Sequence, residues 1–291
     1  MRITIIGASL LAIAGATSAH AGEVKFKPLI DARLRYETVD QTGIANDADS
    51  VTLRMRSGGE LTKGPFSFLA EAEATLAISE DYNSGVNGKT LFPVVADPQN
   101  IELNRIQLQY KTKPLTVTIG RQRINLDDQR FVGAVGWRQN EQTFDAVRVE
   151  WTGVKNLKAD VTYSWSDRTI WGIDGVKNGT NQQAISGDNF FGTLAYTTKL
   201  GTLTGFAFLI DQDELPAAVL RKSNQTFGAR FAGAHAFSKT VKLSYAASYA
   251  HQSDYNNNPV NYSADYYAGE LALEAKGFKV TGGYELLGSD G

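Results

Sequence analysis

Two kinds of connection alternate along the chain, and this rhythm constrains the fold more than any other feature of the sequence. Six short turns are separated by long polar stretches at roughly 38–50, 80–99, 125–141, 167–187, 211–223 and 252–260. Tight turns at one end and long loops at the other are typical of antiparallel barrels that cross a membrane with strands. Soluble sandwiches mix their loop lengths, because crossover connections break the order. The short turns are Thr62-Lys63-Gly64-Pro65, Thr112-Lys113-Pro114, Thr152-Gly153-Val154-Lys155-Asn156, Thr198-Lys199-Leu200-Gly201, Phe237-Ser238-Lys239-Thr240 and Ala275-Lys276-Gly277.

The segments between the turns alternate at period two, which is the period of a β-strand. In the segment 30–37 every second residue is charged, and the residues between them are apolar or aromatic. In segments 51–56, 66–78, 157–166 and 241–249, polar or charged residues alternate in the same way with apolar or aromatic ones. A strand with charges on one face and apolar side chains on the other needs water on one side and lipid on the other. We therefore expect an all-β, transmembrane antiparallel β-barrel, with about thirteen strands in this chain.

The first 21 residues have the features of a secretory signal peptide. Arg2 provides the charged start, residues 3–16 form a short apolar run, and Ala19-His20-Ala21 is a cleavage site of the A-x-A type. We expect cleavage before Gly22, a β-barrel domain at 22–291, and an integral location in the bacterial outer membrane among its lipids. The odd strand number and the last residues, 286–291, predict that C-terminal strands of the barrel are missing.

Composition and motifs exclude several other functions. The chain has no cysteine, and its net charge of -2 does not suggest a nucleic-acid partner. Of its three histidines, His20 lies in the leader, and neither a G-x-S-x-G nor an H-E-x-x-H motif is present. The Asp127-Asp128 pair lacks the regularly spaced oxygen ligands of a calcium loop. We expect no catalysis, no cofactor and no metal.

One segment carries a family signature. Residues 120–133 read GRQRINLDDQRFVG, and GWRQN at 136–140 and QTFDAV at 142–147 follow. This segment resembles the alginate-export family of outer-membrane porins. The resemblance implies a barrel of about eighteen strands that continues past residue 291. It also implies a pore lined by arginines, through which anionic polysaccharide or similar solutes move passively.

Alternation and the signature together define candidate site residues. Strict alternation would place Arg121 and Arg123 on the lipid side, so we predict a bulge near Gly120 or a position above the membrane. For each arginine the competing interpretation is an ion pair with an acidic residue on a neighbouring strand. A second set of residues forms either an inward-folded constriction or an external loop network: Asp127, Asp128, Trp137, Gln139 and Asn140. The predicted solute path comprises Arg33, Arg35, Arg54, Arg56, Arg105, Arg121, Arg123, Arg130, Arg138, Arg148 and Arg230.

These observations favour a channel for anionic polysaccharide of the alginate type or for small anionic saccharides. Arginine suits such solutes because its planar guanidinium pairs with carboxylates at any relevant pH. Periplasmic secretion or synthesis components are conceivable partners. A generic porin for small carbohydrates or organic acids is the main alternative. A soluble exported β-protein that binds sugars is a weaker one, because the one-sided charged strands argue against it.

Overall fold

The computed structural model describes residues 2–11, 23–176, 179, 181–213, 220 and 222–289. These residues form fourteen β-strands and one short 3₁₀ turn, η1 (Gly172–Asp174). The strands are β1 (Arg2–Leu11), β2 (Lys25–Asp40), β3 (Ala48–Lys63), β4 (Phe66–Asp81), β5 (Asn100–Lys111), β6 (Leu115–Gln122), β7 (Thr143–Trp151), β8 (Leu157–Arg168), β9 (Ala184–Thr197), β10 (Thr202–Ile210), β11 (Asn224–Ser238), β12 (Val241–Asp254), β13 (Ser263–Ala275) and β14 (Phe278–Leu287).

The strands form one antiparallel sheet in which every strand pairs with its neighbours in the sequence, so the order runs from β1 to β14. This simple order confirms the all-β prediction, and β2 to β14 are the thirteen strands expected after the leader. β1 lies in the predicted leader and pairs with β2, with Arg2 opposite Asp40. The cleavage site at 19–21 lies outside the described residues, so removal of the leader stays a prediction.

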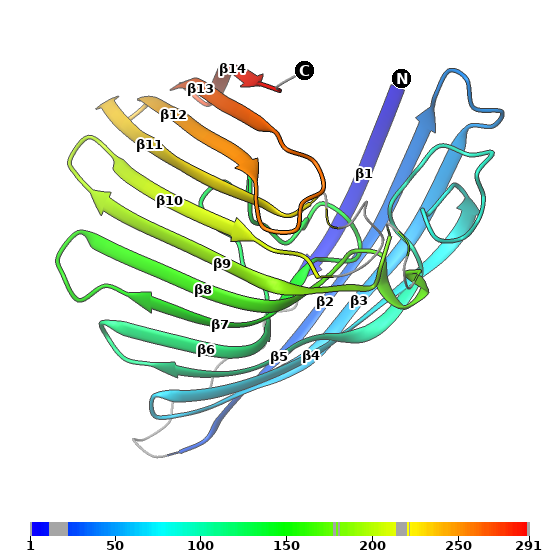
Figure 1. Cartoon of the computed structure of the whole chain (residues 1–291), viewed down its shortest axis with the longest axis horizontal. Coiled ribbons are helices and arrows are strands. Elements are labelled where there is room, and N and C mark those ends of the chain that lie inside the picture. The colour runs from blue at the N-terminus through cyan, green and yellow to red at the C-terminus, as the bar shows by residue number, and fades with distance from the viewer. Residues whose placement is uncertain are drawn as a thin grey trace. The chain divides into compact units, whose positions relative to one another are not determined.

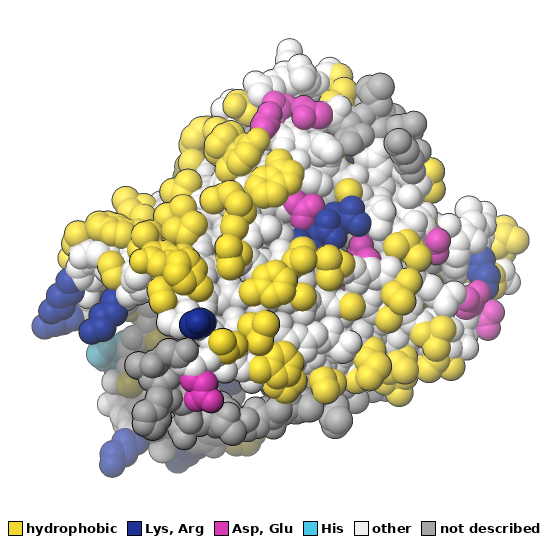
Figure 2. All heavy atoms as spheres, turned by 90° about the horizontal axis from the view of Figure 1, so that it is seen from below, with side chains coloured by type: hydrophobic (Ala, Val, Ile, Leu, Met, Phe, Trp, Pro, Cys, Tyr) yellow, Lys and Arg dark blue, Asp and Glu magenta, His cyan; other side chains and the backbone are white. Residues whose placement is uncertain are grey.

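The strands of the polar-faced sheet, such as β2 to β5, have a polar face and an apolar face, and the apolar face is the exposed one. On the apolar face, 68% of Ile101 and 55% of Leu76 is exposed, whereas Glu73 and Thr52 on the polar face are buried. Figure 2 shows hydrophobic side chains spread over much of the face seen from below. A protein dissolved in water has the opposite arrangement and rarely exposes apolar patches of this extent. Among the described residues, no helix is long and apolar enough to cross a membrane.

The chain divides into two compact units. The first comprises Met1–Lys111, Thr118–Val147 and Ser164–Ser186, and the second comprises Thr112–Val117, Arg148–Tyr163 and Gly187–Gly291. The second unit contains the turns after β5, β7, β9, β11 and β13, and the turns after β7, β9 and β11 lie at the left of Figure 1. The long connections leave the opposite ends of the strands.

A tyrosine–aspartate pair recurs three times on the apolar face, each time close to a long connection. The tyrosine hydroxyl donates to an aspartate on the next strand, at 2.8, 2.5 and 3.0 Å. In the first and third pairs, the aspartate lies two residues closer to the long connection than the residue opposite the tyrosine. Rings with a polar edge suit the boundary between hydrocarbon and water. The pairs are Tyr36 with Asp49, Tyr163 with Asp188, and Tyr249 with Asp265.

Candidate functional site

A dense cluster of buried charged side chains lies on the polar face of β2 to β5, within the first unit. We call this surface the polar wall. It is built by alternation, because every second residue of each strand points to the same side. Its members are Asp31, Arg33, Arg35, Glu37, Thr52, Arg54, Arg56, Glu71, Glu73, Thr75, Asn104 and Arg105.

Four of the five arginines of the polar wall, all but Arg33, are paired with carboxylates that the structure describes. Arg54 donates to Asp31 on the neighbouring strand, and Arg56 Nε lies 2.5 Å from Glu73 Oε2. Arg35, which is buried, pairs with Glu37. A buried charge needs such a partner, because leaving one member alone in a poorly solvated site costs several kcal/mol. The ion-pair interpretation therefore describes this part of the wall.

A bulge in β5 brings two polar side chains onto the wall side by side. Glu71 lies opposite Arg105, but the next residue of β4, Ala72, lies opposite Leu103, so Asn104 is the additional residue. Strict alternation would have put Arg105 on the apolar face together with Leu103, and the bulge returns it to the polar face. Arg105 then forms a two-pronged pair with Glu71 at 2.8 and 2.7 Å.

The long connection between β6 and β7 forms a compact loop, here called the signature loop (residues 123–142). It has an apolar centre of its own, in which Ile124, Leu126, Val132 and Ala134 are buried. Backbone contacts close it, with Leu126 N donating to Val132 O at 3.1 Å and Gln142 N donating to Ala134 O at 2.8 Å. The loop is therefore a folded element and not an extended excursion.

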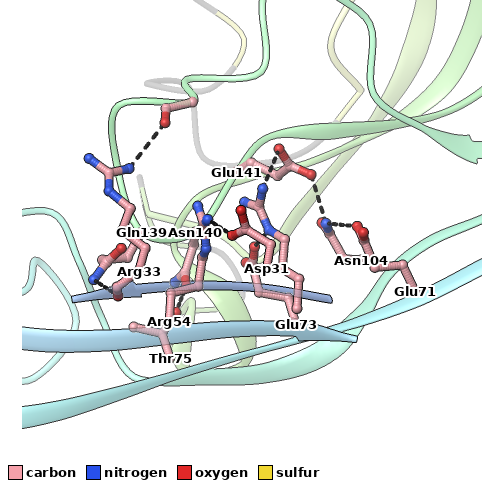
Figure 3. Close-up of polar contacts among 12 residues, drawn as sticks. Asp31, Arg33, Arg54, Glu71, Glu73, Thr75, Asn104, Gln139, Asn140 and Glu141 are labelled. Carbon is pink, nitrogen blue, oxygen red and sulfur yellow. Dashed lines mark hydrogen bonds and ion pairs between the residues drawn. The ribbon is translucent and has the colours of Figure 1, made fainter. Parts of the chain in front are cut away.

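Three consecutive buried residues attach the signature loop to the polar wall. Gln139 donates through its side-chain amide to Thr52 Oγ1 at 2.8 Å and to Thr52 O at 3.0 Å. The amide of Asn140 accepts from Thr75 Oγ1 at 2.7 Å and donates to Pro98 O and Ile170 O. Figure 3 shows both side chains directed at the strands. The loop thus folds over the polar face.

Glu141 is the third anchor, and it joins several charged groups. Its carboxylate accepts from Asn104 at 2.7 Å, and it accepts from Arg123 at 2.6 and 2.5 Å. Arg56 Nη1 of β3 lies 3.2 Å away. Because Glu141 is buried, its charge is compensated by arginines from both the loop and the wall. Figure 3 shows Glu141 above Asn104, with Glu71 beside it.

Arg33 differs from the other arginines of the wall, because it donates hydrogen bonds to backbone carbonyls of the signature loop. It donates to Trp137 O at 2.9 Å, to Arg138 O at 3.1 Å and to Gly136 O at 3.2 Å. Arg33 lies directly opposite Arg54, and like charges in that position repel. The Arg33 side chain turns toward the loop, where its guanidinium group finds hydrogen-bond acceptors and lies farther from Arg54. Arg33 therefore holds the signature loop by charge-assisted hydrogen bonds.

A second connection, at 82–99, reaches the same place through Asp97. This buried aspartate accepts from Gln139 N at 2.9 Å and pairs with Arg35. Its backbone oxygen accepts from the Tyr82 hydroxyl at 2.7 Å. Burial, and then the negative charge of Asp97, raises the pKa of the Tyr82 phenol, which lies outside the strands. The carboxylate of Asp97 thus joins the connection at 82–99 to the signature loop and to β2.

The backbone at Gly120 has a φ of +110°. A Cβ at this position would lie 2.4 Å from Ile106 O, so only glycine fits. Beyond it, Arg121 pairs with Asp145 at 2.8 Å and donates to Leu103 O. Arg123 follows the end of β6 and pairs with Glu141, so both arginines have acceptors. The carboxylate of Glu141 raises the pKa of Arg123 against the lowering effect of burial.

The remaining predicted residues lie in several places. Arg138 pairs with Glu37 at 3.1 Å and belongs to the anchored loop, whereas 61% of Trp137 is exposed. The start of the loop, with Asp127, Asp128 and Arg130, is exposed. Within the second unit, Arg148 pairs with Asp160 at 2.6 Å, and Arg230 lies on β11 opposite Thr204 and Ser248.

Sequence reasoning missed three members of the site. Asp97 lies in a long polar stretch with no periodicity that would single it out. Asn104 depends on the bulge, which a two-residue period does not predict. Glu141 follows Gln139 and Asn140 directly in the signature, so the same segment contained the signal for it. Among the described residues, no group of three or more His, Cys, Asp or Glu residues is placed to hold a metal ion.

The arrangement as a whole is a hydrogen-bonded surface of charged and polar side chains with an attached loop, on a sheet whose other face is apolar. Several buried polar atoms keep unused hydrogen-bonding capacity, including Arg54 Nε, Glu73 Oε1 and Gln139 Oε1. Such atoms suit water or a polar solute. Chemically, the surface offers guanidinium groups in fixed positions and alternating charge.

Solved structures similar to this chain are outer-membrane channels. OccAB1 of Acinetobacter baumannii has a TM-score of 0.67 at 14% identity, and the match covers 90% of this chain and 65% of that one. OccD3 of Pseudomonas aeruginosa has a TM-score of 0.63 at 12% identity, with 96% and 61% covered. A BenF-like porin of Pseudomonas fluorescens Pf-5 has a TM-score of 0.61 at 12% identity, with 92% and 68% covered. The chain thus spans about two-thirds of the length of these proteins.

At identities this low the likeness is one of fold, and the fold is that of a porin: an antiparallel β-barrel integral to the outer membrane. Within that class, residues 29–286 match the alginate export family, and the chain belongs to it. No curated protein matches the chain. The family match extends the resemblance of one segment to nearly the whole sequence.

Proposed function

We propose that this protein is a passive outer-membrane channel for anionic saccharides, either an alginate-like polysaccharide or smaller uronate-type solutes. Membership of the alginate export family supports transport of this kind. The observation that carries the proposal is the polar wall with the signature loop attached to it. In a channel, the polar wall faces the lumen, the apolar face contacts outer-membrane lipid, and the loop narrows the passage.

The pairing of the arginines with carboxylates supports weak binding of anions at many successive positions. At least eight of the eleven predicted path arginines have a carboxylate within 4 Å. Their positive charge is partly compensated, so each is a weak site for an anion. Weak sites in series let a charged polymer bind and move on without being trapped. Arg33, which is held by carbonyls only, is the arginine of the wall with the most uncompensated charge.

A generic porin for small carbohydrates or organic acids is the second candidate, and the charge balance of the wall favours it. A wall in which carboxylates accompany nearly every arginine gives little preference between ions of either sign. A catalytic role finds no support in the described site, because its side chains serve ion pairs and loop anchoring. The exposed apolar face argues against a soluble sugar-binding protein.

Ion selectivity in planar bilayers tests the proposal. Under a salt gradient we expect a reversal potential that favours anions, because the guanidinium groups attract them at a narrow place. The Arg33→Gln variant is the informative change, since it removes charge without leaving a carboxylate unpaired. Replacement of Arg54 or Arg56 would leave Asp31 or Glu73 alone and disturb folding.

The matched control is Lys63→Gln at the end of β3, which removes one positive charge from an exposed lysine outside the polar wall. Reduced anion preference in Arg33→Gln, with little change in the control, would support a path along the polar wall. A channel with no ion preference in the unmodified protein would favour the generic porin, and absence of conductance would refute both candidates.

A further inference from the structure

Lysines gather at the short-turn end of the second unit, and neither the signature nor the polar wall includes them. Each of the five turns in this unit contains a lysine, and the second residue of β8, β12 and β14 is also a lysine. Two carboxylates, Glu150 and Glu274, lie among them, so the formal excess is six positive charges. We call this set the lysine row. It comprises Lys113, Lys155, Lys158, Lys199, Lys239, Lys242, Lys276 and Lys279.

The row is continuous because successive hairpins are neighbours in the sheet, and backbone hydrogen bonds join three of the four pairs of successive turns. Thr152 N donates to Pro114 O at 2.8 Å, and Thr197 N donates to Asn156 O at 2.9 Å. Lys276 N donates to Thr240 O at 3.1 Å. Successive turns are two strands apart, which is roughly 10 Å. This spacing is close to the Debye length at physiological ionic strength, about 8 Å, so the fields of neighbouring ammonium groups overlap.

Most of these ammonium groups have no acidic partner among the described residues. The exception is Lys158, whose Nζ lies 2.8 Å from Glu150 Oε1. Glu274 lies opposite both Lys242 and Lys279, yet no ion pair within 4 Å forms between them in the described part of the chain. Most of the positive charge of the lysine row is therefore not compensated by ion pairs within the protein, in contrast to that of the paired arginines of the polar wall.

The last two hairpins form a concave site in this row. A hollow of about 500 Å³ is lined by Lys239, Lys242, Lys276 and Lys279, with Glu274 as its acidic member. This volume lies in the range of about 300–1,000 Å³ that small-ligand sites occupy. Four ammonium groups around one hollow favour an anion with more than one negative charge.

The side on which these lysines project identifies the occupant. Lys242 and Lys279 alternate with Val241 and Val280 of the apolar face, so they belong to the polar face. Lipid contacts the apolar face, whereas a dissolved solute approaches the polar one. Lysine forms point-charge contacts without the two-pronged geometry of arginine, so it attracts carboxylates without fixing their orientation. This chemistry fits a mobile, multiply charged solute.

The opposite end of the same unit has the opposite charge. Asp211, Asp213 and Asp254 lie at the long-loop end, away from the apolar face. Lys222 is the one lysine there among the described residues. An anion therefore meets attraction at the short turns and repulsion at the long loops. In bacterial outer-membrane barrels the short turns face the periplasm.

We propose that the lysine row is a capture site for carboxylated oligosaccharides, and that it makes solute binding one-sided, favouring the short-turn mouth. This inference rests on the proposed channel function and adds a direction to it. The row raises the local concentration of the polyanion, and the polar wall then provides weaker sites. Because the attraction is long-ranged and exposed, salt weakens it.

One-sided channel block tests the inference on the full protein in planar bilayers. The probe is a galacturonate hexamer added to one side at a time. A single cysteine at position 257 (Asn257→Cys), in an exposed loop of a protein without cysteines, reports orientation through a membrane-impermeant thiol reagent. At about 0.15 M salt we expect block to begin about tenfold faster from the short-turn side, and at about 1 M salt the difference shrinks.

The variant replaces the four lysines of the hollow, 239, 242, 276 and 279, by glutamine, and the control replaces Lys89 and Lys222 of the long-loop end. The four lysines of the hollow are exposed, so the variant is expected to fold, and heat-dependent mobility on gels verifies this. Loss of the one-sided difference in the variant alone supports the inference. Equal block from both sides, or one-sided block that persists in the variant, overturns the inference. So does one-sided block that appears only in membranes of anionic lipid. In each of these cases, normal conductance would leave the proposed channel function intact. No conductance in the unmodified protein overturns both.

Discussion

Replacement of Glu141 by glutamine tests whether ion pairs hold the signature loop on the polar wall. The side chain is 2% exposed and compensates Arg123 and Arg56, while Asn104 donates to it. Removing one member of a buried pair costs about 3–5 kcal/mol. We expect the lower end, about 3 kcal/mol, because Arg123 is 32% exposed and Arg56 keeps Glu73 as a partner.

Urea-induced unfolding in lipid vesicles, followed by tryptophan fluorescence, measures the lost unfolding free energy as a lower urea concentration at the midpoint of unfolding. The matched control is Glu150→Gln, which breaks a pair with Lys158 at 28% and 47% exposure. An exposed pair contributes at most about 1 kcal/mol. A Glu141→Gln protein within about 0.5 kcal/mol of the unmodified protein, or equal to the control, would refute the reasoning. In the Glu141→Gln background, Arg123→Met should restore part of the loss, because the two residues are coupled.

Three further predictions concern backbone strain, burial and orientation. Gly120→Ala should lower the unfolding free energy by about 2 kcal/mol, because a side chain there is strained, whereas Gly205→Ala has free space and should change it little; equal urea midpoints would contradict this. Burial raises the pKa of Tyr82, so the folded state keeps its proton. The contribution of the Tyr82 proton to the unfolding free energy is therefore full below pH about 10, and it is lost as the pH rises above that value. Above pH about 10, the unfolding free energy of Tyr82→Phe should fall less steeply than that of the unmodified protein. Parallel curves of unfolding free energy against pH would contradict this. A cysteine replacing Glu270 should react with a water-soluble thiol reagent, and one replacing Leu271 should react with a lipid-dissolved reagent; equal labelling would contradict the assignment of faces.

Much of the fold was predictable from local pattern, because a strand's two faces repeat every two residues. The charged set of the segment 30–37 lies on the polar face of β2, and the short turns lie where the composition placed them. The bulge at Asn104 shows the limit of the method. Arg105 was assigned to the correct face, yet strict counting from Leu103 gives the opposite answer. The location of a bulge depends on cross-strand packing, which no local period contains.

The site was predictable only in part, because its contacts join distant segments. Arg35 and Asp97 are 62 residues apart, and Gln139 and Thr52 are 87 apart. Nothing in the sequence near Asp97 indicates that a guanidinium will face it. The signature identified Gln139 and Asn140 as members of a network but left open whether the loop folds inward. Their complete burial against the strands of the polar wall could be learned only from the structure.

The uptake of two sugars of equal size tests the central claim most directly. In liposome-swelling assays, the account predicts that galacturonate enters faster than galactose, and that added salt reduces the difference. Equal rates would contradict selective passage of anionic saccharides and favour a generic porin. Absence of swelling with either sugar would contradict a channel altogether.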